Sequence, residues 1–195
     1  GASYVRAGKN LEAARTYEQY TVMFPTGERI ESAYLNIIDA YREAGEYAKA
    51  AEWVEKAVLE FPGKSTEVNA LQALVRMELY RGRWNEAAEA ADRMLAVRSF
   101  AGSMTSADEA RFLKGFALDK AGKRSEANTV FASITQSPTS YFGGLADERN
   151  TGSPVKKTAV VSSRMYSQYP TPFKLQVMRH AAKQRIDPRF ILAIM

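Results

Sequence analysis

A repeat of 37 residues constrains this chain more than any other feature of its sequence. The segments GKNLEAAR, GEYAKAAE, GRWNEAAE and GKRSEANT begin at Gly8, Gly45, Gly82 and Gly122. The first three glycines are spaced by 37 residues, and the fourth lies 40 residues beyond the third. Such a period is typical of helical solenoids, in which each helix pair buries its apolar face against neighbouring pairs. No segment alternates polar and apolar residues with a period of two, so we expect an all-α fold.

The residues of the repeat have separate structural roles. We expect each glycine to end one helix in a left-handed turn before the next helix begins. The alanine pairs that follow, such as Ala50-Ala51, allow the second helix to approach its partner closely. This pattern resembles the tetratricopeptide repeat (TPR), with helices or turns longer than in the usual unit of about 34 residues. We therefore expect a TPR-like helical-hairpin solenoid, or superhelix, over residues 1–136, an architecture that mostly binds peptides or positions other domains.

Three short motifs follow the repeats in an informative order. SYFGGLADERNTG begins at Ser140, YPTPF begins at Tyr169, and IDPRFILAIM closes the sequence. Behind a helical solenoid, this order resembles the soluble lytic murein transglycosylases. The matching residues are Tyr141, Gly143, Leu145, Ala146, Tyr169, Pro170, Pro172, Phe173, Pro188, Ala193, Ile194 and Met195.

Three further parts of the chain are expected after residue 136. Residues 137–152 are predicted to form the closing helix of the solenoid, beginning at Ser137-Pro138. Residues 153–171 are rich in Ser, Thr and Pro and lack helical periodicity, which indicates a linker. The resemblance implies that residues 172–195 form the first helices of a goose-type-lysozyme-like catalytic domain.

The resemblance also implies an activity. The family cleaves the bond between N-acetylmuramic acid and N-acetylglucosamine in peptidoglycan and leaves a 1,6-anhydro product, with one glutamate as acid and then base. That glutamate is expected shortly beyond Met195, so this sequence is expected to be truncated and to hold no catalytic residue of the family. The implied location is the periplasm, and the implied partners are peptidoglycan and cell-wall proteins bound through the solenoid. We expect no cofactor and no metal.

Charge is distributed unevenly along the chain. Residues 1–150 hold 19 Lys/Arg and 21 Asp/Glu, whereas residues 151–195 hold 8 Lys/Arg and one acid. Either an anionic partner binds the basic part, or balancing acids follow Met195; both interpretations stay open. No groove-reading or base-stacking motif points to nucleic acid, and no apolar run reaches the roughly 20 residues that cross a bilayer. The lack of cysteine and the single histidine argue against a zinc site.

Several other chemically interesting residues are interpreted as structural. His180 has no identifiable nucleophile or orienting acid to work with. Trp53 and Trp84 have the helical spacing of core residues, although such rings can also stack on sugars. The charged residues interpreted as solvent-exposed are Glu12, Glu86, Glu126, Arg76, Arg81 and Arg83, with a local basic patch as the alternative for the three arginines.

A second function stays open beside the transglycosylase. The chain would then be a non-enzymatic TPR-like adaptor that binds a protein or peptide partner, and the matches after the repeats would be accidental.

Overall fold

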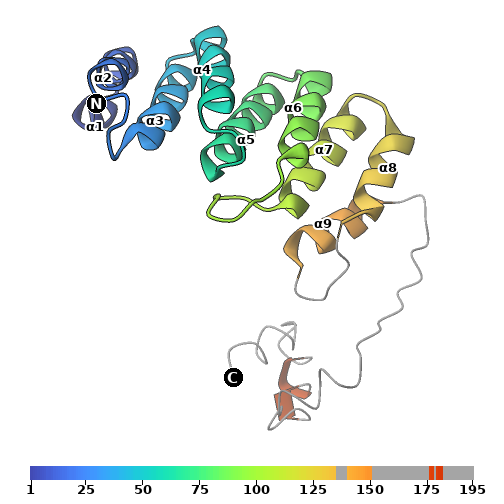
Figure 1. Cartoon of the computed structure of the whole chain (residues 1–195). Coiled ribbons are helices and arrows are strands. Elements are labelled where there is room, and N and C mark those ends of the chain that lie inside the picture. The colour runs from blue at the N-terminus through green and yellow to red at the C-terminus, as the bar shows by residue number, and fades with distance from the viewer. Residues whose placement is uncertain (135–139, 151–175, 178, 182–195) are drawn as a thin grey trace. The chain divides into compact units, whose positions relative to one another are not determined.

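The computed structural model describes residues 1–134, 140–150, 176–177 and 179–181 (Figure 1). The chain divides into two compact units, Gly1–Ser153 and Pro154–Met195. The predicted linker, residues 153–171, and the predicted helix start at Ser137-Pro138 lie outside the described residues.

The described part of the first unit consists of helices and contains no strand. Its nine helices are α1 (Ala2–Arg6), α2 (Asn10–Met23), α3 (Ile30–Glu43), α4 (Tyr47–Glu60), α5 (Ser65–Tyr80), α6 (Trp84–Ala96), α7 (Ala107–Lys120), α8 (Arg124–Ala132) and α9 (Tyr141–Arg149). The first eight helices form four hairpins, each made of two helices that are consecutive in the chain (Figure 1). Between hairpins, α3 contacts α5 and α5 contacts α7. The expected helical-hairpin solenoid is confirmed.

The hairpin turns explain the repeated glycine. Gly45 and Gly82 have φ angles of 76° and 71°, in the left-handed region that side chains disfavour. The residue after each glycine donates its N–H back to a carbonyl in the last turn of the preceding helix, at 2.9 Å both from Glu46 to Tyr41 and from Arg83 to Glu78. A Cβ at Gly45 would meet no described atom within 4 Å. The backbone conformation, and not a lack of space, therefore requires glycine there.

Small and aromatic residues share the core of the array. Ala13, Ala14, Ala50 and Ala87 are fully buried, as expected if these positions let two helices approach closely. In the same core cluster as Ala13, Ala14 and Ala50, the ring of Tyr34 packs edge-on against Trp53 at 5.1 Å and Phe61 at 5.0 Å between centroids. These contacts confirm Trp53 as a core residue.

The longer spacing before Gly122 arises in a loop. Helix α6 ends at Ala96 and α7 begins at Ala107, whereas α4 and α5 are joined by residues 61–64 alone. The loop of residues 97–106 is braced internally, because the Ser103 hydroxyl lies within hydrogen-bonding distance of the carbonyl oxygens of Phe100 at 2.6 Å and Thr105 at 2.9 Å, which share its single proton. The extra residues therefore lengthen the connection between two helices. Helix α7 has the same length as α3, 14 residues.

Candidate functional site

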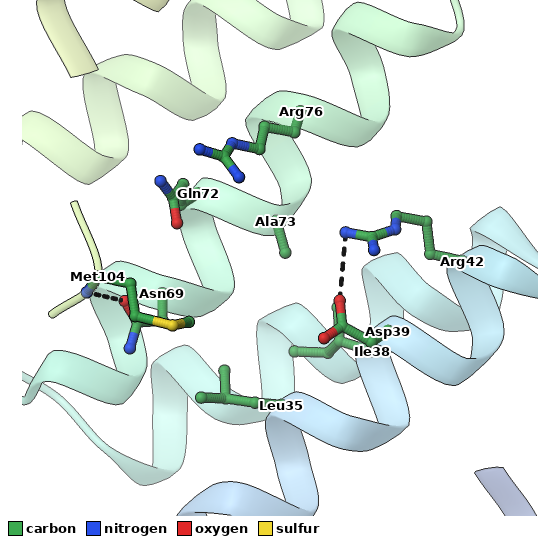
Figure 2. Close-up of a pocket in the computed structure, with 9 residues that line it drawn as sticks. All are labelled: Leu35, Ile38, Asp39, Arg42, Asn69, Gln72, Ala73, Arg76 and Met104. Atoms are coloured by element: carbon green, nitrogen blue, oxygen red, sulfur yellow. Dashed lines mark hydrogen bonds and ion pairs between the residues drawn. The ribbon is translucent and has the colours of Figure 1, made fainter. Parts of the chain in front are cut away.

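A cavity of about 190 Å³ opens between α3 and α5 (Figure 2). Both helices are the first helices of their hairpins, and the loop of residues 97–106 reaches the same place. The residues that line the cavity are Leu35, Ile38, Asp39, Arg42, Asn69, Gln72, Ala73, Arg76 and Met104. The long loop between α6 and α7, which lengthens the repeat, thus contributes Met104 to the wall of the cavity.

The side-chain amides of Asn69 and Gln72 on α5 each make one hydrogen bond that fixes the orientation of the amide group. The oxygen Oδ1 of Asn69 accepts the backbone N–H of Met104 at 2.9 Å, which only an oxygen can do. The nitrogen Nε2 of Gln72 donates to the carboxylate of Glu109 at 3.1 Å, which only the nitrogen can do. Asn69 is left with its Nδ2 donors and Gln72 with its Oε1 acceptor, and neither atom has a hydrogen-bond partner among the described residues.

Glu109 is held in place from three directions. It lies in the first turn of α7, where its backbone N–H donates to the Ser106 hydroxyl at 3.1 Å. Its carboxylate accepts from Gln72, from the Thr105 hydroxyl at 3.0 Å and from the Arg76 guanidinium at 2.7 Å. This network connects the third and fourth hairpins beside the cavity.

The charges around the cavity are balanced by carboxylates. Arg42 pairs with Asp39 at 3.2 Å and Glu43 at 3.0 Å, and Arg76 pairs with Glu109. Loss of hydration raises the pKa of Asp39 while Arg42 opposes the rise. The Asp39 side chain is 56% exposed and lies beside the Arg42 guanidinium, and both the exposure and this cation favour the charged form of the carboxylate. Among the described residues of this cluster, the carboxylates of Asp39, Glu43 and Glu109 lie against the guanidiniums of Arg42 and Arg76. The cluster beside the cavity therefore carries no surplus positive charge.

A second hollow of about 590 Å³ continues the first toward the hairpin turns. The two share Arg42 and Arg76, and the second adds Tyr47, Met77 and Tyr80 among its lining residues. Tyr80 is 83% exposed, and the Arg81 guanidinium lies 4.8 Å from the centre of the Tyr47 ring. The two hollows form one groove along α3 and α5, here called the α3–α5 groove.

The three arginines singled out from the sequence do not form a basic patch. Arg76 pairs with Glu109, and Arg81 and Arg83 approach Glu78 at 3.0 and 3.8 Å. The Glu78 side chain is only 7% exposed, so this carboxylate is a buried partner for Arg81. Glu12, Glu86 and Glu126 are exposed, as predicted.

Helix α9 carries the first of the three motifs. The Ser140 hydroxyl caps it by accepting the N–H of Gly143 at 3.0 Å. Gly143 and Ala146 are buried, Leu145 is half-buried and Tyr141 is exposed. The ring of Phe142 lies 5.8 Å from that of Phe112 on α7, which attaches α9 to the last hairpin.

The opposite end of α9 is attached to the same helix. The Arg149 guanidinium lies 4.9 Å from the Phe116 ring centre and 5.8 Å from that of Phe112. Such contacts contribute about 0.5–1 kcal/mol each at exposed sites. Both ends of α9 thus contact α7, and α9 also packs against α8.

The other sequence-predicted motif residues are not described structurally. Those outside the described residues are Tyr169, Pro170, Pro172, Phe173, Pro188, Ala193, Ile194 and Met195. In the second unit His180 is exposed and Ala181 is buried. Within the described residues, no group of three His, Asp or Glu side chains is placed to hold a metal ion.

Sequence reasoning missed the residues that form the groove. Asn69, Gln72 and Glu109 appear as ordinary polar residues of two helices. Two signals were available: the buried-looking helix STEVNALQALVRMELY contains several uncharged polar positions, and the repeat lengthens just before Glu109. Neither signal shows by itself that Met104 reaches α5.

Comparison with known proteins supports the repeat assignment. A sequence model described as tetratricopeptide repeat matches residues 1–65, which span α1 to α4. No curated protein matches the chain. Among the described helices, none has the length and apolar character needed to cross a membrane. The chain thus contains tetratricopeptide-type repeats, an architecture that indicates a scaffold for protein interaction.

Proposed function

We propose that this chain is the scaffold and domain junction of a periplasmic lytic murein transglycosylase. The observation that carries the proposal is α9: a Ser140-capped helix bearing the SYFGGLA motif packs on the last hairpin of a TPR-type array. In the resembling family, the same kind of segment closes the solenoid. The YPTPF and IDPRFILAIM motifs follow in the family's order, which adds sequence support.

The role proposed for the first unit is mechanical. Stacked hairpins hold their neighbours through contacts such as the Glu109 network, so the array is a stiff support for whatever follows α9. The proposed reaction belongs to a glutamate outside residues 1–195, which would protonate the leaving oxygen and then, as carboxylate, remove a proton from the sugar's 6-hydroxyl. The substrate's acetamido group would take the place of the second carboxylate of other glycosidases.

The experiment compares two chains on purified sacculi. The 195-residue chain should release no 1,6-anhydromuropeptides, and a chain extended through the rest of the parent gene should release them. The extended sequence should read Gln-Glu-Ser near Met195, and substitution of that glutamate by glutamine should abolish release. An inactive extended chain would overturn the family proposal, and activity of residues 1–195 would overturn the position given to the glutamate.

A second candidate function is a TPR-like adaptor without enzymatic activity. The α3–α5 groove favours it, because the groove combines oriented amides, aliphatic walls and the exposed Tyr80 on one face of the array. Binding of a protein segment there is compatible with either function. A stop codon directly after Met195 in the gene would favour the adaptor alone.

A further inference from the structure

We propose that α7, α8 and α9 form one rigid body that turns against α2–α6, and that the carboxylates of Glu109 and Asp92 hold these two bodies in the closed arrangement. The hinge depends on neither candidate function. Its consequence is that α9 changes direction relative to α2–α6 when the two carboxylates lose their partners.

The apolar core of the array has two parts. Buried residues of α2 to α6 form the first cluster, which reaches α7 through Ala110. The second cluster extends from α6 to α9, and its buried members are Ala87, Ala88, Ala117, Leu118, Ala127, Phe131, Ile134 and Ala146. Helix α6 contributes Ala90, Ala91 and Met94 to the first cluster. The two parts of the core therefore meet on α6.

The seam between α6 and α7 buries mostly small side chains. The buried residues of α6 are four alanines and Met94, and those of α7 are Ala110, Gly115, Ala117 and Leu118. By contrast, α3 and α4 bury Ile37, Ile38, Tyr41 and Trp53 at the earlier hairpins. Since apolar stabilisation grows with the area removed from water, polar contacts carry a larger share of the stabilisation at the α6–α7 seam.

Two carboxylates fasten α7 to the first body from different sides. Glu109 joins α7 to α5 by accepting from Gln72 at 3.1 Å and Arg76 at 2.7 Å. Asp92 on α6 pairs with Lys114 on α7 at 2.6 Å. Positions 109 and 114 are five residues apart, so their side chains leave α7 in directions roughly 140° apart. Both contacts must open before α7 can turn.

The Glu109 contact is the stronger of the two. Its side chain is only 14% exposed, so the charged hydrogen bond with Arg76 is weakly screened by salt. The Asp92 side chain is 57% exposed, and ion pairs at such positions contribute little to stability. We therefore expect Glu109 to determine how much of the closed arrangement is populated.

The chain between the two bodies is short. Met104 belongs to the first body, because its backbone N–H donates to Asn69 on α5 at 2.9 Å. Helix α7 begins at Ala107 (Figure 1), so Thr105 and Ser106 form the link. Ser106 is extended, with φ −126° and ψ 161°. Rotation about a few backbone torsions at the end of a helix is the usual form of a hinge.

Aromatic contacts make α8 and α9 move with α7. The ring of Phe112 on α7 lies 5.8 Å from Phe131 on α8 and 5.8 Å from Phe142 on α9. The Arg149 guanidinium at the end of α9 lies 4.9 Å from the ring centre of Phe116 on α7. Helices α8 and α9 are thus each attached to α7 by large side chains.

The test uses spin labels on the full 195-residue chain, which contains no cysteine. Ala48→Cys on α4 with Ser125→Cys on α8 places one label on each body. Gln19→Cys with Ala48→Cys reports on the first body alone, and Ser125→Cys with Asp147→Cys reports on the second. All four positions are exposed. Double electron–electron resonance then gives the distribution of distances for each pair.

The test variant combines Glu109→Gln with Asp92→Asn, which removes both charges and keeps the side-chain sizes. It should broaden the distribution between residues 48 and 125 and lower the ratio of closed to open chains about tenfold or more. Both distributions within a body should stay unchanged. The control Glu86→Gln with Glu89→Gln removes two charges at exposed positions on α6 and should alter no distribution.

Three results would overturn the proposal. The first is an unchanged distribution between residues 48 and 125 in the test variant. The second is broadening between residues 125 and 147 as well, with loss of helical circular dichroism, because α7–α9 would then unfold and not turn as one body. The third is equal broadening in the control, which would show that net charge, and not Glu109 and Asp92, closes the array.

Discussion

The phenol of Tyr41 on α3 donates a hydrogen bond of 2.8 Å to Oε1 of Glu18 on α2, and the indole of Trp53 on α4 donates to the same oxygen at 3.0 Å. A single carboxylate therefore joins three helices of the first two hairpins. The residues are separated by 23 and 35 positions in sequence, so this junction depends on the stacked fold.

Removing the Tyr41 hydroxyl should destabilise the array. Tyr41→Phe keeps the buried ring and loses one hydrogen bond to a charged group, for which we expect a loss of about 1–2 kcal/mol in the free energy of unfolding. Urea denaturation at neutral pH measures the loss. Tyr80→Phe removes the hydroxyl of a tyrosine that is largely exposed and should change stability by less than about 0.5 kcal/mol. Equal effects of the two substitutions would show that the Glu18 bond contributes nothing.

The same hydroxyl predicts a decline in stability at alkaline pH. Burial, with the bond to Glu18 as the second cause, raises the pKa of Tyr41 from 10.0 to about 12. Because the folded pKa exceeds the unfolded one, the stabilisation is complete below pH 10 and is lost as pH rises toward about 12.

Comparison with Tyr41→Phe isolates this contribution. Burial also raises the pKa of Tyr34, so the variant should show a shallower decline in unfolding free energy and not a flat one. Unfolding free energies of the two proteins, measured at a series of pH values between 10 and about 12, test this difference in slope. Parallel curves for the two proteins would contradict the assignment.

The buried alanines should not tolerate larger side chains. Ala50 and Ala87 are fully inaccessible to solvent, so Ala50→Leu or Ala87→Leu should destabilise by roughly 1–3 kcal/mol through overpacking. Thermal denaturation followed by circular dichroism measures the effect. Ala48→Leu, at an exposed position on the same helix as Ala50, is the matched control and should be close to neutral. An unchanged melting temperature for both buried variants would mean that these positions do not face a partner helix.

Gly115 should resist replacement although it lies inside α7. A Cβ there would come within 2.5 Å of Cε1 of Phe131, and that ring is only 1% exposed. The helix-propensity gain of Gly→Ala, about 1 kcal/mol, is expected to be outweighed, giving net destabilisation of about 1–2 kcal/mol.

Two further variants make the Gly115 prediction specific. Gly144→Ala, on α9 where no described atom lies within 4 Å of the added Cβ, should stabilise by up to about 1 kcal/mol. Phe131→Leu should be less damaging in the Gly115→Ala background than in the parent, because the smaller side chain relieves the clash. If the destabilisations by Gly115→Ala and Phe131→Leu were additive, the Cβ of residue 115 would not clash with the Phe131 ring.

The features predicted correctly from the sequence were those set by local constraints. A glycine with positive φ is required where these hairpins turn, and a small residue where the helices of a hairpin approach closely, so both recur, as at Gly45 and Ala50, in the spacing that reveals the fold. The position of the extra residues before Gly122 was not predictable, because a longer helix and a longer loop give the same spacing.

The groove depends on tertiary placement and could not be predicted in the same way. Asn69 and Gln72 are buried only because α5 has helices on several sides, and Asn69 is oriented by a backbone N–H from residue 104. The motif residues from Tyr169 onward, and the basic composition of residues 151–195, remain sequence predictions.

The central position of α5 also has a consequence for how the array opens. Helix α5 contacts α3, α4, α6 and α7, whereas α1 has no buried residue. In a stack held by neighbour contacts, fraying begins at an unsupported end and advances one hairpin at a time. Amide hydrogens should therefore exchange with deuterium rapidly in α1 and slowest in α5, so the helix that carries Asn69 and Gln72 would keep its shape while the first hairpin opens and closes.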